Sequence, residues 1–190
     1  FDLIAITLNP GGVDNSPLDE LCKKLEVPFY EVQTQIKEIV FDIRKEKNPC
    51  SLCANLRRGA LNSKAQELGC NKVALGHHKD DAIETYFMSL GYEGRINCFS
   101  PRSYMHKNNI TLIRPMVFID ETMTIKAARE YNYPIIKNPC PADGKTNRQD
   151  VKELLRRLDK EIPGFKKNLF KSLRNAEQMF VWDKEVVQTM

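Results

Sequence analysis

Short apolar segments alternate with longer amphipathic ones along this chain, and that alternation restricts the possible folds more than any other feature. Strand-like runs occupy residues 3–8, 28–32, 73–75, 111–114 and 133–136. Helix-like segments cover residues 16–25, 34–46, 50–68, 80–90 and 122–131. This pattern predicts an α/β fold, with a mostly parallel sheet flanked by helices. Two further helices, at 147–160 and 166–180, indicate a C-terminal helical extension, so we expect an α/β domain over 1–146 and the extension over 147–190.

A cluster of polar residues connects one predicted strand to the next helix, where ligands of parallel sheets bind. Gly76 would let the backbone approach a ligand closely, and the helix start would offer free N–H groups to a phosphate. A histidine here could contact a nucleotide, and an aspartate could hold a metal ion or only cap the helix. Because the whole string falls in one turn, we favour a nucleotide and metal site made of Gly76, His77, His78, Asp80 and Asp81.

Two cysteines, Cys50 and Cys53, lie three residues apart at the predicted start of a helix, and Cys140 follows in a later loop. The helix dipole favours thiolates at such a start. Three thiolates are one ligand short of a closed tetrahedral zinc site, and they suit an iron–sulfur cluster that keeps one iron open. A redox dithiol and a zinc site completed by a histidine are the alternatives. The other three cysteines are interpreted as structural.

Positive charge is concentrated near the C-terminus. Lys and Arg number 29 against 25 Asp and Glu, for a net charge of +4, and residues 145–174 alone hold ten basic and four acidic side chains, a local +6. A basic stripe on a helix is commonly only a solvated face, but this excess indicates a phosphate backbone as partner. The residues expected to contact such a backbone are Arg57, Arg58, Arg148, Lys152 and Arg156.

Several classes of protein are excluded by the sequence. No run of 18 apolar residues occurs, so we expect no membrane-spanning helix. The first residues lack the basic region and cleavage site of a signal peptide. Six cysteines in 190 residues do not form a disulfide scaffold, and paired cysteines without a secretory signal indicate metal or redox chemistry in the cytoplasm.

The motifs resemble one family when they are taken together. In chain order they are Cys50-Ser51-Leu52-Cys53, Leu56-Arg57-Arg58-Gly59, Leu75-Gly76-His77-His78, Asp80-Asp81, Ile113-Arg114-Pro115 and Pro139-Cys140. Their order and spacing resemble the tRNA 2-thiocytidine synthetase family, the TtcA-like branch of the PP-loop (N-type ATP pyrophosphatase) superfamily. The resemblance extends from about residue 1 to residue 175.

The resemblance implies an adenine-nucleotide α-hydrolase-like fold and an ATP-dependent tRNA sulfurtransferase. ATP and Mg²⁺ would adenylate a cytidine carbonyl, and sulfur would then displace AMP. A [4Fe–4S] cluster would bind to Cys50, Cys53 and Cys140, the nucleotide and metal side would include Gly76 to Asp81, and Arg114 would be the family's basic residue near the active site. The implied partners are tRNA, a sulfur donor (a cysteine desulfurase or free sulfide) and a second copy in a homodimer.

One departure from the family concerns its phosphate-binding loop, Ser-Gly-Gly-x-Asp-Ser, which this sequence lacks. The stretch from Pro10 to Ser16 is a near miss with proline at the first position and serine one residue late. We interpret it as a decoy, with a degenerate loop as the minor alternative. We therefore expect the gene product to be longer at its N-terminus, and a chain without the loop to bind ATP poorly.

Two other functions are compatible with the motifs. Other PP-loop enzymes adenylate a base and then use an amine, as a tRNA ligase does, but an amine nucleophile needs no cluster. The chain could instead be a zinc-stabilised nucleic-acid-binding module, with the three cysteines and a histidine as a structural site. The zinc and iron contents of the protein distinguish these possibilities.

Overall fold

The computed structural model describes residues 1–45, 49–137, 140–141, 144 and 146–175. It divides into two compact units, one formed by residues 1–78 and 100–145 and the other by residues 79–99 and 146–190. The sequence indicated a boundary at residue 146, where the second segment of the second unit begins. Nothing in the sequence indicated that residues 79–99 are grouped with the C-terminal helices.

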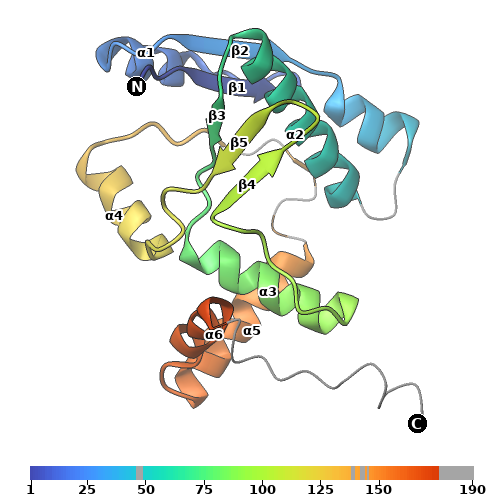
Figure 1. The fold of residues 1–190 in the computed structure, drawn as a ribbon, viewed down its shortest axis with the longest axis vertical. Helices are drawn as coiled ribbons and strands as arrows, with labels where there is room; N and C mark the ends of the chain where they lie inside the picture. Colours follow the sequence, from blue (N-terminus) through green and yellow to red (C-terminus); the bar gives the residue numbers. More distant parts are fainter. Residues whose placement is uncertain (46–48, 138–139, 142–143, 145, 176–190) are drawn as a thin grey trace. The chain divides into compact units, whose positions relative to one another are not determined.

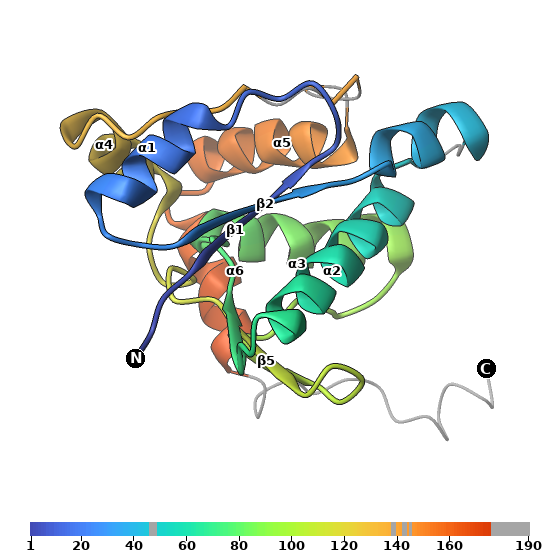
Figure 2. The same ribbon diagram turned by 90° about the horizontal axis from the view of Figure 1, so that it is seen from above.

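The first unit contains two small sheets (Figure 1). Strands β1 (Ala5–Asn9) and β2 (Phe29–Gln33) pair in parallel, and β3 (Lys72–Ala74) pairs in parallel with β5 (Ile110–Ile113), which pairs antiparallel with β4 (Arg102–Met105). In the described part of the chain, the two sheets are not joined by a strand ladder. Helix α1 (Ser16–Lys24) and helix α2 (Pro49–Glu67) lie on opposite sides of the β1–β2 pair (Figure 2). The expected mostly parallel α/β fold is confirmed.

The core of this unit forms where α2 packs against the strands. Ala65 of α2 is buried against Val73, Ile110 and Leu112 of the second sheet, and Ile6 of β1 packs against the same cluster. Alternation along β5 explains its contribution, because its two inward-facing residues are Ile110 and Leu112. This cluster therefore stabilises the pairing of β3 with β5, and so fixes the end of β3 from which the Gly76 loop continues.

Three local predictions differ from the structure. The segment predicted as a helix at 34–46 contains a π-helix, η1 (Glu38–Ile43). Residues 133–136 form no strand, because Tyr133 and Ile135 are exposed. Strand β4 lies in a segment for which the sequence predicts neither a strand nor a helix. Alternate residues of β4 are exposed, so its sequence lacks an apolar run.

The second unit is helical. Helix α3 (Lys79–Glu93) packs against α5 (Asn147–Glu161) and α6 (Phe165–Arg174), while α4 (Glu121–Glu130) belongs to the first unit. Ile83 on α3 is fully buried with Val151 and Leu155 on α5. Burying side chains of this size contributes about 2 kcal/mol each. These apolar contacts hold the C-terminal helices on α3.

Candidate functional site

Helix α2 presents two thiols on its first turn. Cys50 is exposed and Cys53 is half-buried, and their spacing of three residues places them on one side of the helix. No acidic side chain lies in that turn, so the positive end of the helix dipole acts on the sulfurs without competition from a carboxylate of the helix itself. The turn is therefore suited to holding thiolates.

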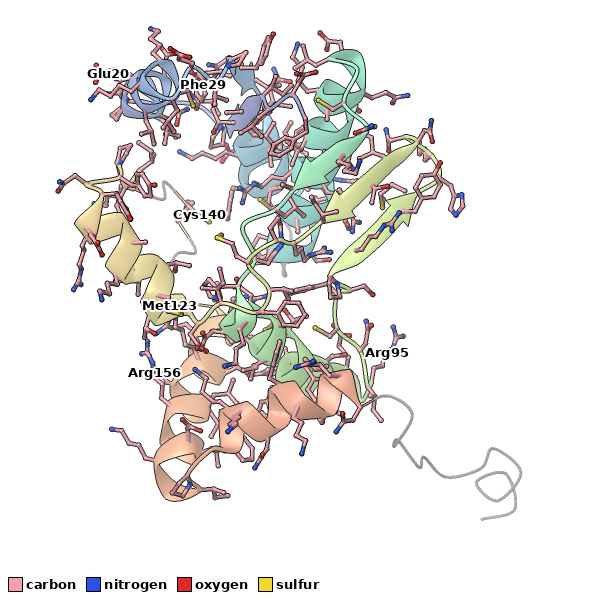
Figure 3. The ribbon with its side chains drawn as sticks, turned by 60° about the vertical axis from the view of Figure 1, so that its left-hand side comes forward. Glu20, Phe29, Arg95, Met123, Cys140 and Arg156 are labelled. Atoms are coloured by element: carbon pink, nitrogen blue, oxygen red, sulfur yellow. The ribbon has the colours of Figure 1, made fainter. Side chains whose placement is uncertain are left out.

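The third thiol, of Cys140, lies in the electrostatic reach of Cys53. Burial raises the pKa of the Cys53 thiol above its ordinary value, the Arg57 guanidinium opposes that rise, and negative charge on Cys140 and Cys50 adds to it. This influence on Cys53 requires Cys140 and Cys50 each to lie near the Cys53 sulfur. Figure 3 shows Cys140 on the segment that follows α4, which carries Met123. The fold thus brings Cys140 near a helix turn that is far from it in sequence.

The donor set fits a group larger than one ion. Within the described residues, no three or more His, Cys, Asp or Glu side chains are drawn together closely enough to hold a single metal ion. A zinc site completed by a histidine is therefore not assembled in the described part of the chain. In an iron–sulfur cluster each cysteine binds a different iron, so a set of three cysteines suits such a cluster by its chemistry.

The loop after β3 carries the predicted glycine and histidines. A methyl group added at Gly76 would meet only Met116 Cε, at an ordinary contact distance of 3.5 Å, so packing within the chain does not require glycine here. His78 Nε2 lies 3.9 Å from Glu121 Oε1 at the start of α4, and His77 is half-buried. Glu121 was not anticipated from the sequence, although an acidic residue at a helix start is a recognisable signal.

Arg114 follows β5 at the same edge of the sheet. Because β3 and β5 are parallel, with Ala74 opposite Ile113, Arg114 and the Gly76 loop leave the sheet on the same side. Its Nη1 atom donates a hydrogen bond of 2.6 Å to the carbonyl of Ser100. Arg114 thus has a structural contact, and its proposed role near the nucleotide remains a prediction.

The acidic pair begins α3 in the second unit, and both carboxylates meet cations there. Lys166 of α6 forms an ion pair with Asp80, and Arg148 Nη1 of α5 lies 3.7 Å from Asp81 Oδ1. Arg148 also donates a hydrogen bond of 3.1 Å to Glu84, a buried carboxyl. Burial raises the pKa of Glu84, and the neighbouring Arg148 opposes that rise. The sequence predicted Arg148 only as an RNA contact, indicated Lys166 only as part of the basic C-terminal segment, and assigned no role to Glu84.

The remaining basic residues expected at RNA are on helix surfaces. Arg57 and Arg58 are exposed on α2, where Arg58 Nη2 donates to Asn55 Oδ1 over 2.7 Å. Arg156 is exposed on α5 (Figure 3). Lys152, on the same helix, is half-buried. Their exposure is compatible with a phosphate partner, and RNA binding by these residues remains a prediction.

The glycine turn after β1 is closed by its own side chains. Asn9 is buried, its Oδ1 accepts a 2.9 Å hydrogen bond from the Gly11 amide, and its Nδ2 donates to the carbonyl of Val13 over 2.9 Å. Gly11 and Gly12 have positive φ angles of 107° and 74°. Because Asn9 already accepts from the Gly11 amide, this amide is not directed to a phosphate. The geometry supports the interpretation of the turn as a decoy.

No helix among the described residues has the length and apolar character needed to cross a membrane.

Comparison with known proteins places the chain among tRNA-modifying enzymes. The PP-loop domain family matches residues 11–158. A tRNA-cytidine(32) 2-sulfurtransferase of Geobacter metallireducens is 34% identical over 98% of this chain, which covers 74% of that relative. The enzyme of the same name from Aliivibrio fischeri is 38% identical over 93% of this chain, which covers 59% of it.

A solved structure has the same fold. The U34-tRNA thiolase NcsA from Methanococcus maripaludis, determined with its [4Fe-4S] cluster, has a TM-score of 0.75 and 26% identity to this chain. The alignment covers 96% of this chain and 64% of the thiolase, so the chain spans just under two thirds of that protein.

Proposed function

Because this chain belongs to the PP-loop domain family and, within it, to the tRNA-cytidine 2-sulfurtransferases, we propose that it carries out ATP-dependent 2-thiolation of a tRNA base. The proposed substrate is a cytidine, as in the relatives' name. The thiolase from M. maripaludis acts on U34 instead, so the fold accommodates either pyrimidine. The reaction class is sulfur transfer after adenylation of the base.

The observation that supports this proposal is the placement of Cys50 and Cys140 within electrostatic reach of the Cys53 thiol. Cys50 and Cys53 present their sulfurs from one helix turn, and Cys140 contributes from a loop that follows α4. We propose that these residues hold a [4Fe-4S] cluster, which when bound supplies an open iron site for sulfur. Arg57 places a positive charge beside Cys53 and so favours the ligating thiolate over the thiol.

The groups proposed for ATP and Mg²⁺ carry out binding and orientation. Gly76, His77 and His78 leave the carboxyl end of β3, and the Glu121 carboxylate near His78 would orient its imidazole. Asp80 and Asp81 supply carboxylate oxygens, which Mg²⁺ prefers as ligands. Arg114 is proposed to stabilise negative charge that develops on the phosphates.

The proposed partners follow from the same reaction. The exposed arginines of α2 and α5 would contact the tRNA backbone and position it without reading its sequence. We also propose a sulfur donor, either a cysteine desulfurase or free sulfide, a homodimeric assembly and a cytoplasmic location. Each of these is a proposal from the family resemblance.

Metal content tests the function most directly. The full-length protein would be purified without oxygen, and iron, sulfide and zinc per chain would be measured for the parental protein, Cys140→Ala and a matched control, Cys22→Ala. We expect about four irons per chain in the parent and the control, and their loss in Cys140→Ala. ATP-dependent thiolation of tRNA should follow the iron content.

Two results would contradict the proposal. One tightly bound zinc without iron would favour a structural metal module that binds nucleic acid. Iron that stays at the parental level in Cys140→Ala would show that Cys140 is not a ligand. Cys22 is a suitable control because it lies on α1, where its neighbouring charge is Asp19 and burial raises the pKa of its thiol.

A further inference from the structure

Both carboxylates of the Asp80–Asp81 pair are held by cations that come from the C-terminal helices. The two residues are adjacent on the first turn of α3, so their side chains leave the helix about 100° apart. One helix of the C-terminal pair reaches each of them, α6 through Lys166 and α5 through Arg148.

Lys166 is built into its place at the start of α6. Its backbone amide donates a 2.9 Å hydrogen bond to Asp159 Oδ1 on α5, and its ammonium group reaches Asp80. The Asp80 side chain is only 11% exposed and that of Lys166 only 30%. Because screening by water is weak at such a depth, this pair interacts more strongly than a surface ion pair. The backbone anchor fixes the point from which the lysine side chain extends.

The planar guanidinium of Arg148 contacts three side chains on one face of α3. Nη1 donates to Glu84 Oε2 over 3.1 Å and lies 3.7 Å from Asp81 Oδ1, while Nη2 donates to Thr85 Oγ1 over 3.2 Å. Residues 81, 84 and 85 share this face because they are three and four positions apart. The fork is thus anchored on Glu84 and Thr85 and directs its charge to Asp81. A lysine could not make this set of contacts.

Helix packing alone does not require these ion pairs. Ile83 is buried against Val151 and Leu155, and the Phe87 ring meets the Phe165 ring edge-on at 6.4 Å. These apolar contacts attach α5 and α6 to the middle of α3. The lysine–Asp80 and arginine–Asp81 pairs are instead confined to its first turn, where the proposed metal ligands are.

We infer that Lys166 and Arg148 are positioning residues that orient the carboxylates of Asp80 and Asp81 for the nucleotide reaction. This inference rests on the proposed function, since it assigns the acidic pair to the ATP and Mg²⁺ side. It changes the expected role of the C-terminal helices, because α5 and α6 then complete the acidic pair as well as carrying exposed charge toward RNA. Arg148 acts mainly within the protein.

The experiment compares Lys166→Met with Lys167→Met in the full-length protein. Both variants remove one positive charge from α6, and Lys167 is exposed. Any loss of electrostatic attraction to RNA is therefore the same in the two variants. Steady-state thiolation of tRNA is measured with ATP and Mg²⁺. We expect kcat to fall roughly tenfold to a hundredfold in Lys166→Met, as for a misplaced catalytic group, with KM for tRNA equal to that of Lys167→Met. Lys166→Arg, which keeps the charge, should recover most of the rate.

A double-mutant cycle tests whether Lys166 acts through Asp80. In an Asp80→Asn background, Lys166→Met should cause no further loss of kcat, and the two substitutions should also be coupled in urea unfolding without ATP or Mg²⁺. Should Lys166→Met fail to fold, Arg148→Lys serves as the second variant. It keeps a cation for Glu84 but loses the fork, so the expected result is a folded protein with lowered kcat.

The outcomes separate this inference from the proposed function. Equal kcat values for Lys166→Met and Lys167→Met, or an absence of coupling between Lys166 and Asp80 in unfolding, would overturn the inference while thiolation by the parent stands. A parental protein with a full cluster but no thiolation activity would overturn the proposed function instead. In that case the double-mutant cycle measured by urea unfolding still decides whether Lys166 and Asp80 are coupled, because it does not require thiolation activity.

Discussion

The first turns of α2 and α3 use the same backbone feature for two different anions. Each turn places the positive end of a helix dipole beside these side chains. At α2 the groups are thiols, with Cys50 exposed and Cys53 half-buried, and the cation that favours the Cys53 thiolate is Arg57 of the same helix. At α3 they are carboxylates, largely buried, and their cations come from two other helices.

This difference separates local from long-range construction of a site. The thiol turn needs one distant residue, Cys140, to complete its proposed ligand set. The carboxylates of the first turn of α3 and the nearby Glu84 are contacted by Arg148 and Lys166, which lie more than 60 positions away in sequence. Substitutions at the first should change what the protein binds, whereas substitutions at the second should also change how firmly the helices hold together.

The largest effect is expected at the thiol turn. Cys53→Ala removes one of three cluster ligands, so iron and thiolation activity should both fall to background, because three cysteines leave no spare ligand. The free energy of unfolding of the apoprotein should change by only about 1 kcal/mol, since Cys53 is half-buried. Iron analysis and urea unfolding, with Cys98→Ala as control, check both parts. Iron that stays at the parental level in Cys53→Ala would show that the first turn of α2 does not supply a cluster ligand at this position.

The next effect is expected from Arg148→Met at the carboxylate turn. This substitution leaves the buried Glu84 carboxyl without its guanidinium, which should lower the free energy of unfolding by about 2 kcal/mol. Iron content should not change. Urea unfolding measures the loss, and Arg157→Met, on the exposed side of α5, is the matched control. A loss no greater than that of the control would show that Arg148 is not anchored on Glu84.

A smaller effect concerns pH. Burial raises the pKa of Glu84 in the folded protein above its ordinary value. Between the ordinary and the raised pKa the folded state holds more protons than the unfolded state, so this group's contribution to stability is lost as pH rises. Arg148 and Lys152 oppose the shift, and Asp81 adds to it.

Glu84→Gln isolates this contribution. We expect the difference in unfolding free energy between parent and variant to move in favour of the variant as pH increases from about 4 into the raised pKa range. Urea unfolding at closely spaced pH values measures the difference. A constant difference across this range would mean that the pKa of Glu84 is not raised by burial.

The smallest effect is expected at a helix start without a chemical role. Thr146 caps α5, and its Oγ1 accepts a hydrogen bond from the Gln149 amide over 3.4 Å. Thr146→Ala should cost about 1 kcal/mol of stability or less at this distance, and Thr146→Ser should cost nearly nothing. Iron content and kcat should match the parent once folding is complete. Loss of kcat in a folded Thr146→Ala variant would extend the positioning role to the cap.

Sequence reasoning located the thiol turn well because its signal is local. Cys50 and Cys53 are three residues apart at a helix start, and the family resemblance supplied Cys140. It also located the start of α3 within a residue, since an acidic first turn follows an apolar strand. The ion pairs of that turn were missed, because Lys166 lies 86 positions from Asp80 and nothing in either neighbourhood identifies the other.

The errors in the sheet have equally physical causes. Residues Arg102–Met105 form an edge strand that exposes every second residue, so its apolar content stays low. The turn that follows uses Asn109 at a φ angle of 53° in place of a glycine, which hides the hairpin signal. Tyr133 and Ile135 have strand-like side chains, but both are exposed and form no ladder.

The sequence distance between α3 and its partners also determines the order in which the protein can be completed during synthesis. The ribosome adds Asp80 long before Lys166, and Ile83 long before Val151 and Leu155. Until α5 and α6 emerge, the nascent α3 has an uncovered apolar face and two carboxylates without their cations. A chain that stalls before residue 166 therefore has the exposed hydrophobic surface on which incomplete proteins aggregate. The acidic turn is thus assembled well after its own residues have left the ribosome.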